Sequence, residues 1–179
     1  MFDRQGSGAM LWSVTLVVAA IVFSFALACA MPFAAIGALA VLVLPIREAF
    51  VTAILGWLAN QVIGFGFLAY PTDPATLAWG FALGLSAIAS VATAQAGDKL
   101  LSRWPFSVRA VFAFGAALFA QQAVVFAASW PLPSHPSAFS LPVIWEIAWT
   151  NALACGTLGA FYGLGSLAGL GMSTRRIPG

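Results

Sequence analysis

The feature that most constrains this chain is an apolar run from Met10 to Ile46 that contains no charged residue. The run holds 37 residues, whereas one transmembrane helix needs about 20. Pro32 lies within it, and proline disfavours a continuous helix. The sequence therefore predicts two membrane-spanning helices over residues 10–30 and 32–46, of which the second is short or tilted.

Composition extends this conclusion to the whole chain. Charged residues make up 7% of the 179 residues and hydrophobic residues 62%, whereas about 25% of an ordinary soluble domain is charged. So little polar surface excludes a soluble enzyme, a nucleic-acid-binding domain and a disordered chain. We expect an all-α integral membrane protein with a single transmembrane domain over residues 1–179. High alanine content and six arginines to one lysine are typical of GC-rich bacterial genomes and favour the bacterial inner membrane.

Four further apolar segments bring the expected bundle to six transmembrane helices, over residues 49–70, 75–96, 107–129 and 141–165. They are separated by the turn at 71–74, a polar loop from Gly97 to Pro105 and a proline-rich loop after Trp130. With both termini in the cytoplasm, six spans place every basic residue on the cytoplasmic side, as the positive-inside rule requires. These residues are Arg4, Arg47, Lys99, Arg103, Arg109, Arg175 and Arg176.

Polar side chains inside the predicted spans are candidate binding residues, because a polar group in hydrocarbon must find a partner. At about 1.5 Å per residue, they lie in the middle or outer part of the membrane, where aromatic side chains also gather. We expect an outward-facing pocket for a neutral or weakly charged organic ligand. Its candidate residues are Cys29, Asn60, Gln61, Tyr70, Trp79, Gln121, Gln122, His135, Trp145, Glu146 and Asn151.

Each of these residue types also has a structural explanation. The amides can form hydrogen bonds between helices, the aromatic rings can form an interfacial belt, and His135 can be a solvated loop residue. Glu146 can lie close enough to the surface to reach water. Cys29, near the outer end of the first span, offers a thiol that can ligate a soft or borderline metal.

The chain lacks the residues that catalysis would need. His135 is the only histidine, so one chain cannot supply a bis-histidine haem, and a zinc site would need three or four ligands. Neither the ATP-binding glycine loop nor a G-x-S-x-G motif is present. We therefore expect no enzyme activity and no resident cofactor.

The chain resembles the substrate-binding S-components of energy-coupling-factor (ECF) vitamin transporters. The shared features are six short spans, a cytoplasmic N-terminus, a length of about 180 residues and an alanine-rich first helix. The resemblance is architectural and covers the whole chain. It implies a ligand site near the outer face, under the loops at Met31–Pro32, 70–74 and 130–141, and docking of the first span on an energy-coupling module. Some solitary cobalamin transporters of that family look as if a cysteine thiolate binds the cobalt, which makes Cys29 the candidate cobalt ligand.

The first hypothesis is thus an uptake protein for a vitamin-like ligand, with cobalamin as the first guess. Its partners would be the lipid bilayer, the small-molecule ligand and an energy-coupling module, with no nucleic acid. The alternative is a structural or assembly subunit of a larger membrane complex, with G-x-x-x-G faces such as Gly80/Gly84 packing on partner helices. The two differ in whether Asn60, Gln61, Gln121 and Glu146 line a cavity or contact one another.

Overall fold

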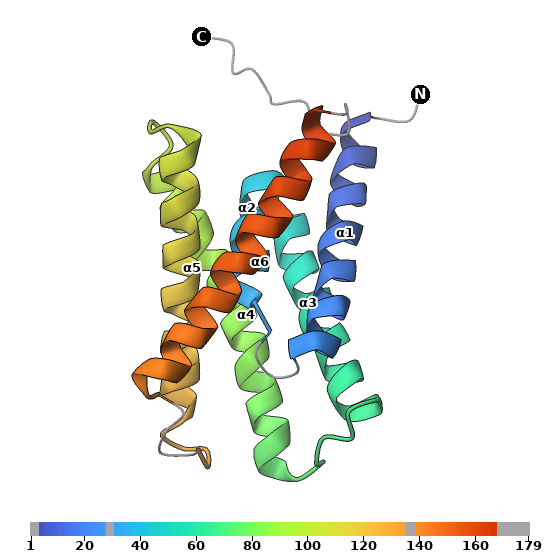
Figure 1. The fold of residues 1–179 in the computed structure, drawn as a ribbon, viewed down its shortest axis with the longest axis vertical. Coiled ribbons are helices and arrows are strands. Elements are labelled where there is room, and N and C mark those ends of the chain that lie inside the picture. The colour runs from blue at the N-terminus through green and yellow to red at the C-terminus, as the bar shows by residue number, and fades with distance from the viewer. Residues whose placement is uncertain (1–3, 28–30, 135–138, 168–179) are drawn as a thin grey trace.

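The computed structural model describes residues 4–27, 31–134 and 139–167, and these residues form six α-helices and no strand (Figure 1). This confirms the all-α fold. The helices are α1 (Arg4–Leu27), α2 (Phe33–Val43), α3 (Ile46–Gly66), α4 (Pro74–Leu100), α5 (Phe106–Ala128) and α6 (Leu141–Leu167).

Four of these helices are long and apolar enough to cross a membrane: α1 from Gly8 onward, α3, α4 and α5. The prediction of a multi-pass membrane protein is confirmed at this level. The helix α6 has 27 residues, about 40 Å, and is therefore long enough to cross a bilayer by length alone. Within the part of the chain that the structure describes, only α1, α3, α4 and α5 meet the combined requirement of length and hydropathy.

The helix α2 corrects the prediction of a span over residues 32–46. It has 11 residues, about 16 Å, whereas the hydrocarbon core is about 30 Å thick. It lies inside the bundle instead, and every residue from Met31 to Ala40 is buried. Its small residues allow this close packing: a Cβ on Gly37 would lie 3.2 Å from Cβ of Ser90 on α4.

The directions of the helices follow from their contacts. The helices α1 and α3 run parallel, because Ala20 lies against Gly56 and Phe25 lies against Phe67. The chain must therefore return to its starting end between them, and α2 occupies that return path. In Figure 1, α1 begins and α6 ends at one end of the bundle, which we call the terminal end. The turn between α3 and α4 lies at the opposite end.

The helices α3 and α4 are antiparallel and pack through glycine notches. The Trp57 side chain lies over Gly84, where an added Cβ would be 2.7 Å from its ring, and Gln61 lies over Gly80. The Trp57 indole Nε1 also donates a hydrogen bond to the carbonyl of Gly80 at 2.8 Å. The G-x-x-x-G spacing at Gly80 and Gly84 therefore serves packing inside this chain.

Several helix boundaries differ from the predicted spans: α1 begins at Arg4 rather than at residue 10, and α3 ends at Gly66 rather than at residue 70. The helix α3 begins at Ile46 rather than at residue 49, directly after Pro45. The helix α4 continues to Leu100, so the first residues of the predicted polar loop from Gly97 are helical. The extra turn places Asp98 2.6 Å from Arg109 in the first turn of α5, and this ion pair ties the two helices together.

Candidate functional site

The candidate site is the beginning of α2, which lies within the bundle. Pro32 is the N-cap residue and its side chain has no polar atom that could cap the helix. A helix leaves its first N–H groups without intrahelical partners, and buried N–H groups need other acceptors. The N–H of Phe33 donates to the carbonyl of Met31 at 2.9 Å, and that of Ile36 donates to Pro32 at 3.1 Å.

Side-chain amides from two other helices satisfy the remaining two N–H groups. The N–H of Ala34 donates to Oε1 of Gln121 on α5 at 2.8 Å. The N–H of Ala35 donates to Oδ1 of Asn151 on α6 at 3.1 Å. The Nδ2 group of Asn151 donates to the carbonyl of Ile147 at 2.9 Å, which turns Oδ1 toward α2. We call Gln121 and Asn151 the amide cap.

Burial makes the amide cap energetically important. Gln121 is 5% exposed and Asn151 0%, and Ala34 and Ala35 are fully buried. Water cannot replace a lost acceptor at such a position, and an unsatisfied buried N–H costs about 1–3 kcal/mol. The two amides therefore join α5 and α6 to the start of α2 through specific contacts.

The amide cap is electrically neutral. A helix N-terminus carries a partial positive charge that favours an anion or an oxygen acceptor, and here amide oxygens fill that role without adding a full charge. Asn60 on α3 is also buried, at 4% exposure. Before α2, the Ser24 hydroxyl donates to the carbonyl of Ala20 at 2.8 Å and contacts Sδ of Met31 at 3.1 Å.

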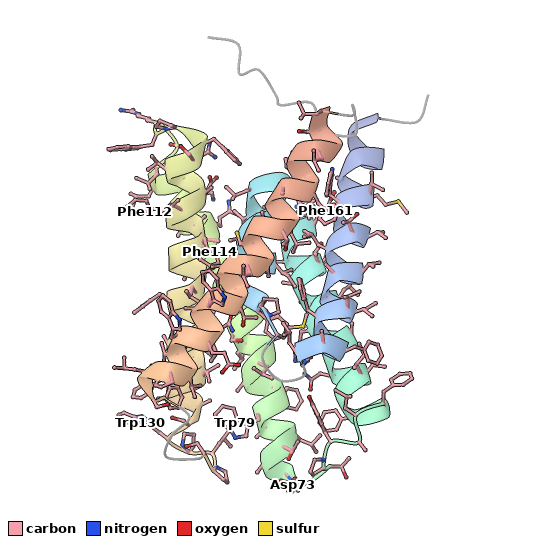
Figure 2. All side chains as sticks on the ribbon, in the orientation of Figure 1. Asp73, Trp79, Phe112, Phe114, Trp130 and Phe161 are labelled. Carbon is pink, nitrogen blue, oxygen red and sulfur yellow. The ribbon has the colours of Figure 1, made fainter. Side chains whose placement is uncertain are left out.

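The predicted aromatic residues lie mostly at the end opposite the terminal end. Figure 2 shows Trp79 and Trp130 there, at the same end of the bundle as Asp73. The Trp79 indole Nε1 donates to the carbonyl of Pro133 at 3.0 Å and so ties α4 to the loop that follows α5. Tyr70 folds back over Gly64, whose missing side chain makes room for the ring.

The predicted residues at the start of α6 point away from the bundle. Trp145 is 70% exposed and Trp149 is 55% exposed. Glu146 is exposed as well. The helix therefore presents these residues to its surroundings, while Asn151 lies on its buried face.

The remaining candidates are divided between half-buried and undescribed positions. Gln61 and Gln122 are half-buried. Cys29 and His135 lie outside the described residues, as do Arg175 and Arg176. The structure thus brings Gln121 and Asn151 together at one helix end and separates them from Trp145 and Glu146.

Two grooves run between helices on the described surface. One of about 360 Å³ lies between α1 and α3 and is lined by Ile21 and Phe67, among others. The other, of about 220 Å³, lies between α3 and α4 and is lined by Trp57, Gln61 and Phe81, among others. Neither groove is lined by the amide cap.

The groups on the other side of the amide cap carry no side-chain signal in the sequence. The backbone N–H groups of Ala34 and Ala35 are the groups that bind Gln121 and Asn151, and an alanine carries no polar side-chain signal. The available signal was Pro32, because a proline N-cap brings no side-chain acceptor and the helix after it needs one.

No protein family, no characterised protein and no solved structure was found that matches this chain. The fold alone therefore defines its class. The protein is a multi-pass helical membrane protein with a buried half-length helix, α2, at the centre of the bundle.

Proposed function

We propose that this protein takes up a vitamin-like organic ligand, with cobalamin as the first candidate, through a pocket that opens on the outer side of the bacterial inner membrane. The observation that supports this most is the start of α2 inside the bundle, capped by neutral amides. Transporters commonly build substrate sites where a helix stops or starts near the middle of the membrane. Both termini would then be cytoplasmic.

The proposed mechanism is an exchange of hydrogen-bond acceptors at the amide cap. Carbonyl or amide oxygens of a ligand would replace the Gln121 and Asn151 oxygens on the N–H groups of α2. The released amides, together with buried Asn60, would then bind other polar atoms of the ligand. A neutral site of this kind suits an uncharged or weakly charged molecule. Rearrangement around α2 would release the ligand inside, with energy supplied by a separate coupling module.

Cys29 enters this proposal through its place in the sequence, three residues before Pro32. A thiolate there would ligate cobalt at the entry to α2. The test is a visible absorption spectrum of the protein purified in mild detergent, with mass spectrometry of any small molecule that co-purifies. We expect a corrinoid band that shifts in Cys29→Ala and is unchanged in the control Cys155→Ala.

A colourless sample that carries another vitamin would keep uptake and remove cobalamin. A sample with no small molecule, before and after incubation with cobalamin, would refute cobalamin as the ligand and would count against the uptake proposal.

A second candidate function is a structural or assembly subunit of a larger membrane complex. The observation that favours it is that the oxygens of Gln121 and Asn151 are already bound to α2. In that function the amides hold the bundle together and the exposed helix faces bind partner helices. A ligand-free sample that brings down the same membrane proteins reproducibly would support this function.

A further inference from the structure

The groove between α3 and α4 combines aromatic walls with one amide. Its volume is about 220 Å³, and its lining includes Trp57, Leu58, Gln61, Leu77 and Phe81. The Trp57 and Phe81 rings lie side by side, with their centroids 6.3 Å apart. Within this lining, polar side-chain atoms come from Gln61 and the Trp57 indole alone.

The groove opens on the outer surface of the bundle. Both of its walls belong to helices that are long and apolar enough to cross a membrane. Phe81 is 67% exposed, and the Leu58 and Leu77 side chains are exposed as well. Because these side chains point away from the other helices, the groove faces the lipid when the protein is in a membrane.

Gln61 has no hydrogen-bond partner in this groove. Its side chain forms no hydrogen bond with any residue that the structure describes. Its Oε1 lies against Gly80, where an added Cβ would be 2.5 Å away. The carbonyl of Gly80 already accepts a hydrogen bond from the Trp57 indole at 2.8 Å. Hydrocarbon offers no acceptor to a polar group, so the Gln61 amide needs one from a bound molecule.

The depth of Gln61 narrows the choice of that molecule. Gln61 precedes Gly66, the last residue of α3, by five residues and thus lies roughly 8 Å inside that helix end. Phe67 and Leu68, which follow the helix, are exposed apolar side chains, so hydrocarbon reaches at least to the end of α3. Phospholipid ester carbonyls lie at the edge of the hydrocarbon core, more than one helical turn further out. The acceptor therefore belongs to a molecule dissolved in the hydrocarbon itself.

Shape and chemistry together define the class of ligand. Flat rings pack well on aromatic side chains, and the amide donor needs an oxygen acceptor. The volume is below the about 300–1,000 Å³ of pockets for drug-sized ligands, so the groove holds one ring, and its open side leaves room for an apolar tail. We propose that the α3–α4 groove binds the ring of a lipid-soluble quinone, with a ring carbonyl accepting a hydrogen bond from Nε2 of Gln61.

This proposal goes beyond vitamin uptake and does not depend on it. The amide cap lines no part of the groove, and a quinone reaches the groove from the bilayer rather than from water. The two proposals are also tested by different molecules, since cobalamin tests one and a quinone tests the other.

The experiment measures the melting temperature of the purified full chain in mild detergent at increasing mole fractions of decylubiquinone in the micelle. A ligand that binds only the folded state raises the melting temperature in a concentration-dependent way. The comparison compound is the arene with the same ring substituents and tail but without the two carbonyl oxygens. We expect it to need an about three- to tenfold higher mole fraction for the same rise, as the loss of one hydrogen bond predicts.

Gln61→Met keeps the length of the side chain and removes the donor. Because Gln61 has no protein partner, the variant should fold, and it should respond equally to the quinone and the arene. The matched control is Gln122→Met, which removes a half-buried amide from α5 outside the groove and should keep the wild-type preference. Leu58→Trp fills the groove and should weaken the response to both compounds.

An azido derivative of the quinone locates the site after irradiation and peptide mapping, and labelling of α3 and α4 beside Trp57 and Phe81 supports the proposal. Three results would overturn it. The first is a wild-type protein that responds equally to the quinone and the arene. The second is a preference for the quinone that persists in Gln61→Met. The third is labelling confined to other helices or abolished by added phospholipid, which would assign the groove to ordinary bilayer lipid.

Discussion

Replacing Gln121 with methionine tests the importance of the amide cap. Methionine keeps the length and approximate volume of the side chain and removes the oxygen that accepts the Ala34 N–H at 2.8 Å. Both residues are buried, so water cannot substitute. We expect Gln121→Met to lower the free energy of unfolding by about 1–3 kcal/mol, the cost of an unsatisfied buried N–H.

The assay is equilibrium unfolding in mixed micelles, followed by the fluorescence of the seven tryptophans. The control is Gln122→Met on the next face of α5, where the side chain is half-buried and we expect a change within about 0.5 kcal/mol. Asn151→Leu should destabilise by a similar amount to Gln121→Met. The double variant should lose less than the sum, because both amides hold one helix end. Equal effects of Gln121→Met and Gln122→Met would refute the reasoning.

Two further predictions concern packing and pH. Gly84→Ala places a Cβ 2.7 Å from the Trp57 ring and should destabilise the same unfolding equilibrium by about 1–3 kcal/mol. The control is Gly115→Ala, whose Cβ meets nothing within 4 Å; it should be neutral or stabilise by up to about 1 kcal/mol. A larger loss of stability in Gly115→Ala than in Gly84→Ala would contradict the conclusion that Gly84 makes room for the Trp57 ring. Hydrogen bonds from Thr76 hold the pKa of Asp73, the N-cap residue of α4, below its ordinary value of 3.8. Its contribution to stability is therefore complete above that value and is lost as the pH falls through the lower folded-state pKa. A pH titration of unfolding should show this loss in the wild type and less of it in Thr76→Val, and identical curves would count against it.

The long helices could be predicted from the sequence because hydropathy acts over some twenty residues at once. Long apolar stretches predict α3, α4 and α5. Asp73 followed by Pro74 is typical of a helix start and marks the beginning of α4. The prediction that a polar loop begins at Gly97 was wrong, because polar residues at the membrane surface can continue a helix. The helix α4 runs on to place Asp98 beside Arg109, a contact between helices that no local pattern contains.

The half-length helix is the clearest case in which local information was insufficient. Pro32 marks the break between α1 and α2, but no local pattern shows how deep in the bundle α2 starts. That depth depends on whether other helices can supply acceptors to its first N–H groups. Gln121 and Asn151 do so from positions 87 and 116 residues further along the chain.

Composition and hydropathy alone are enough to predict a helical membrane protein, because too few polar residues are present to cover a soluble core. The sequence also marks Gln121 and Asn151 as unusual, since amides in apolar helices need partners. Which groups are their partners follows from the packing of the helices. Hydropathy is a sum over neighbours in the chain, whereas a hydrogen bond needs two groups within about 3 Å and in line. The fold brings an amide side chain to a backbone N–H across the bundle and leaves Glu146 on the outside.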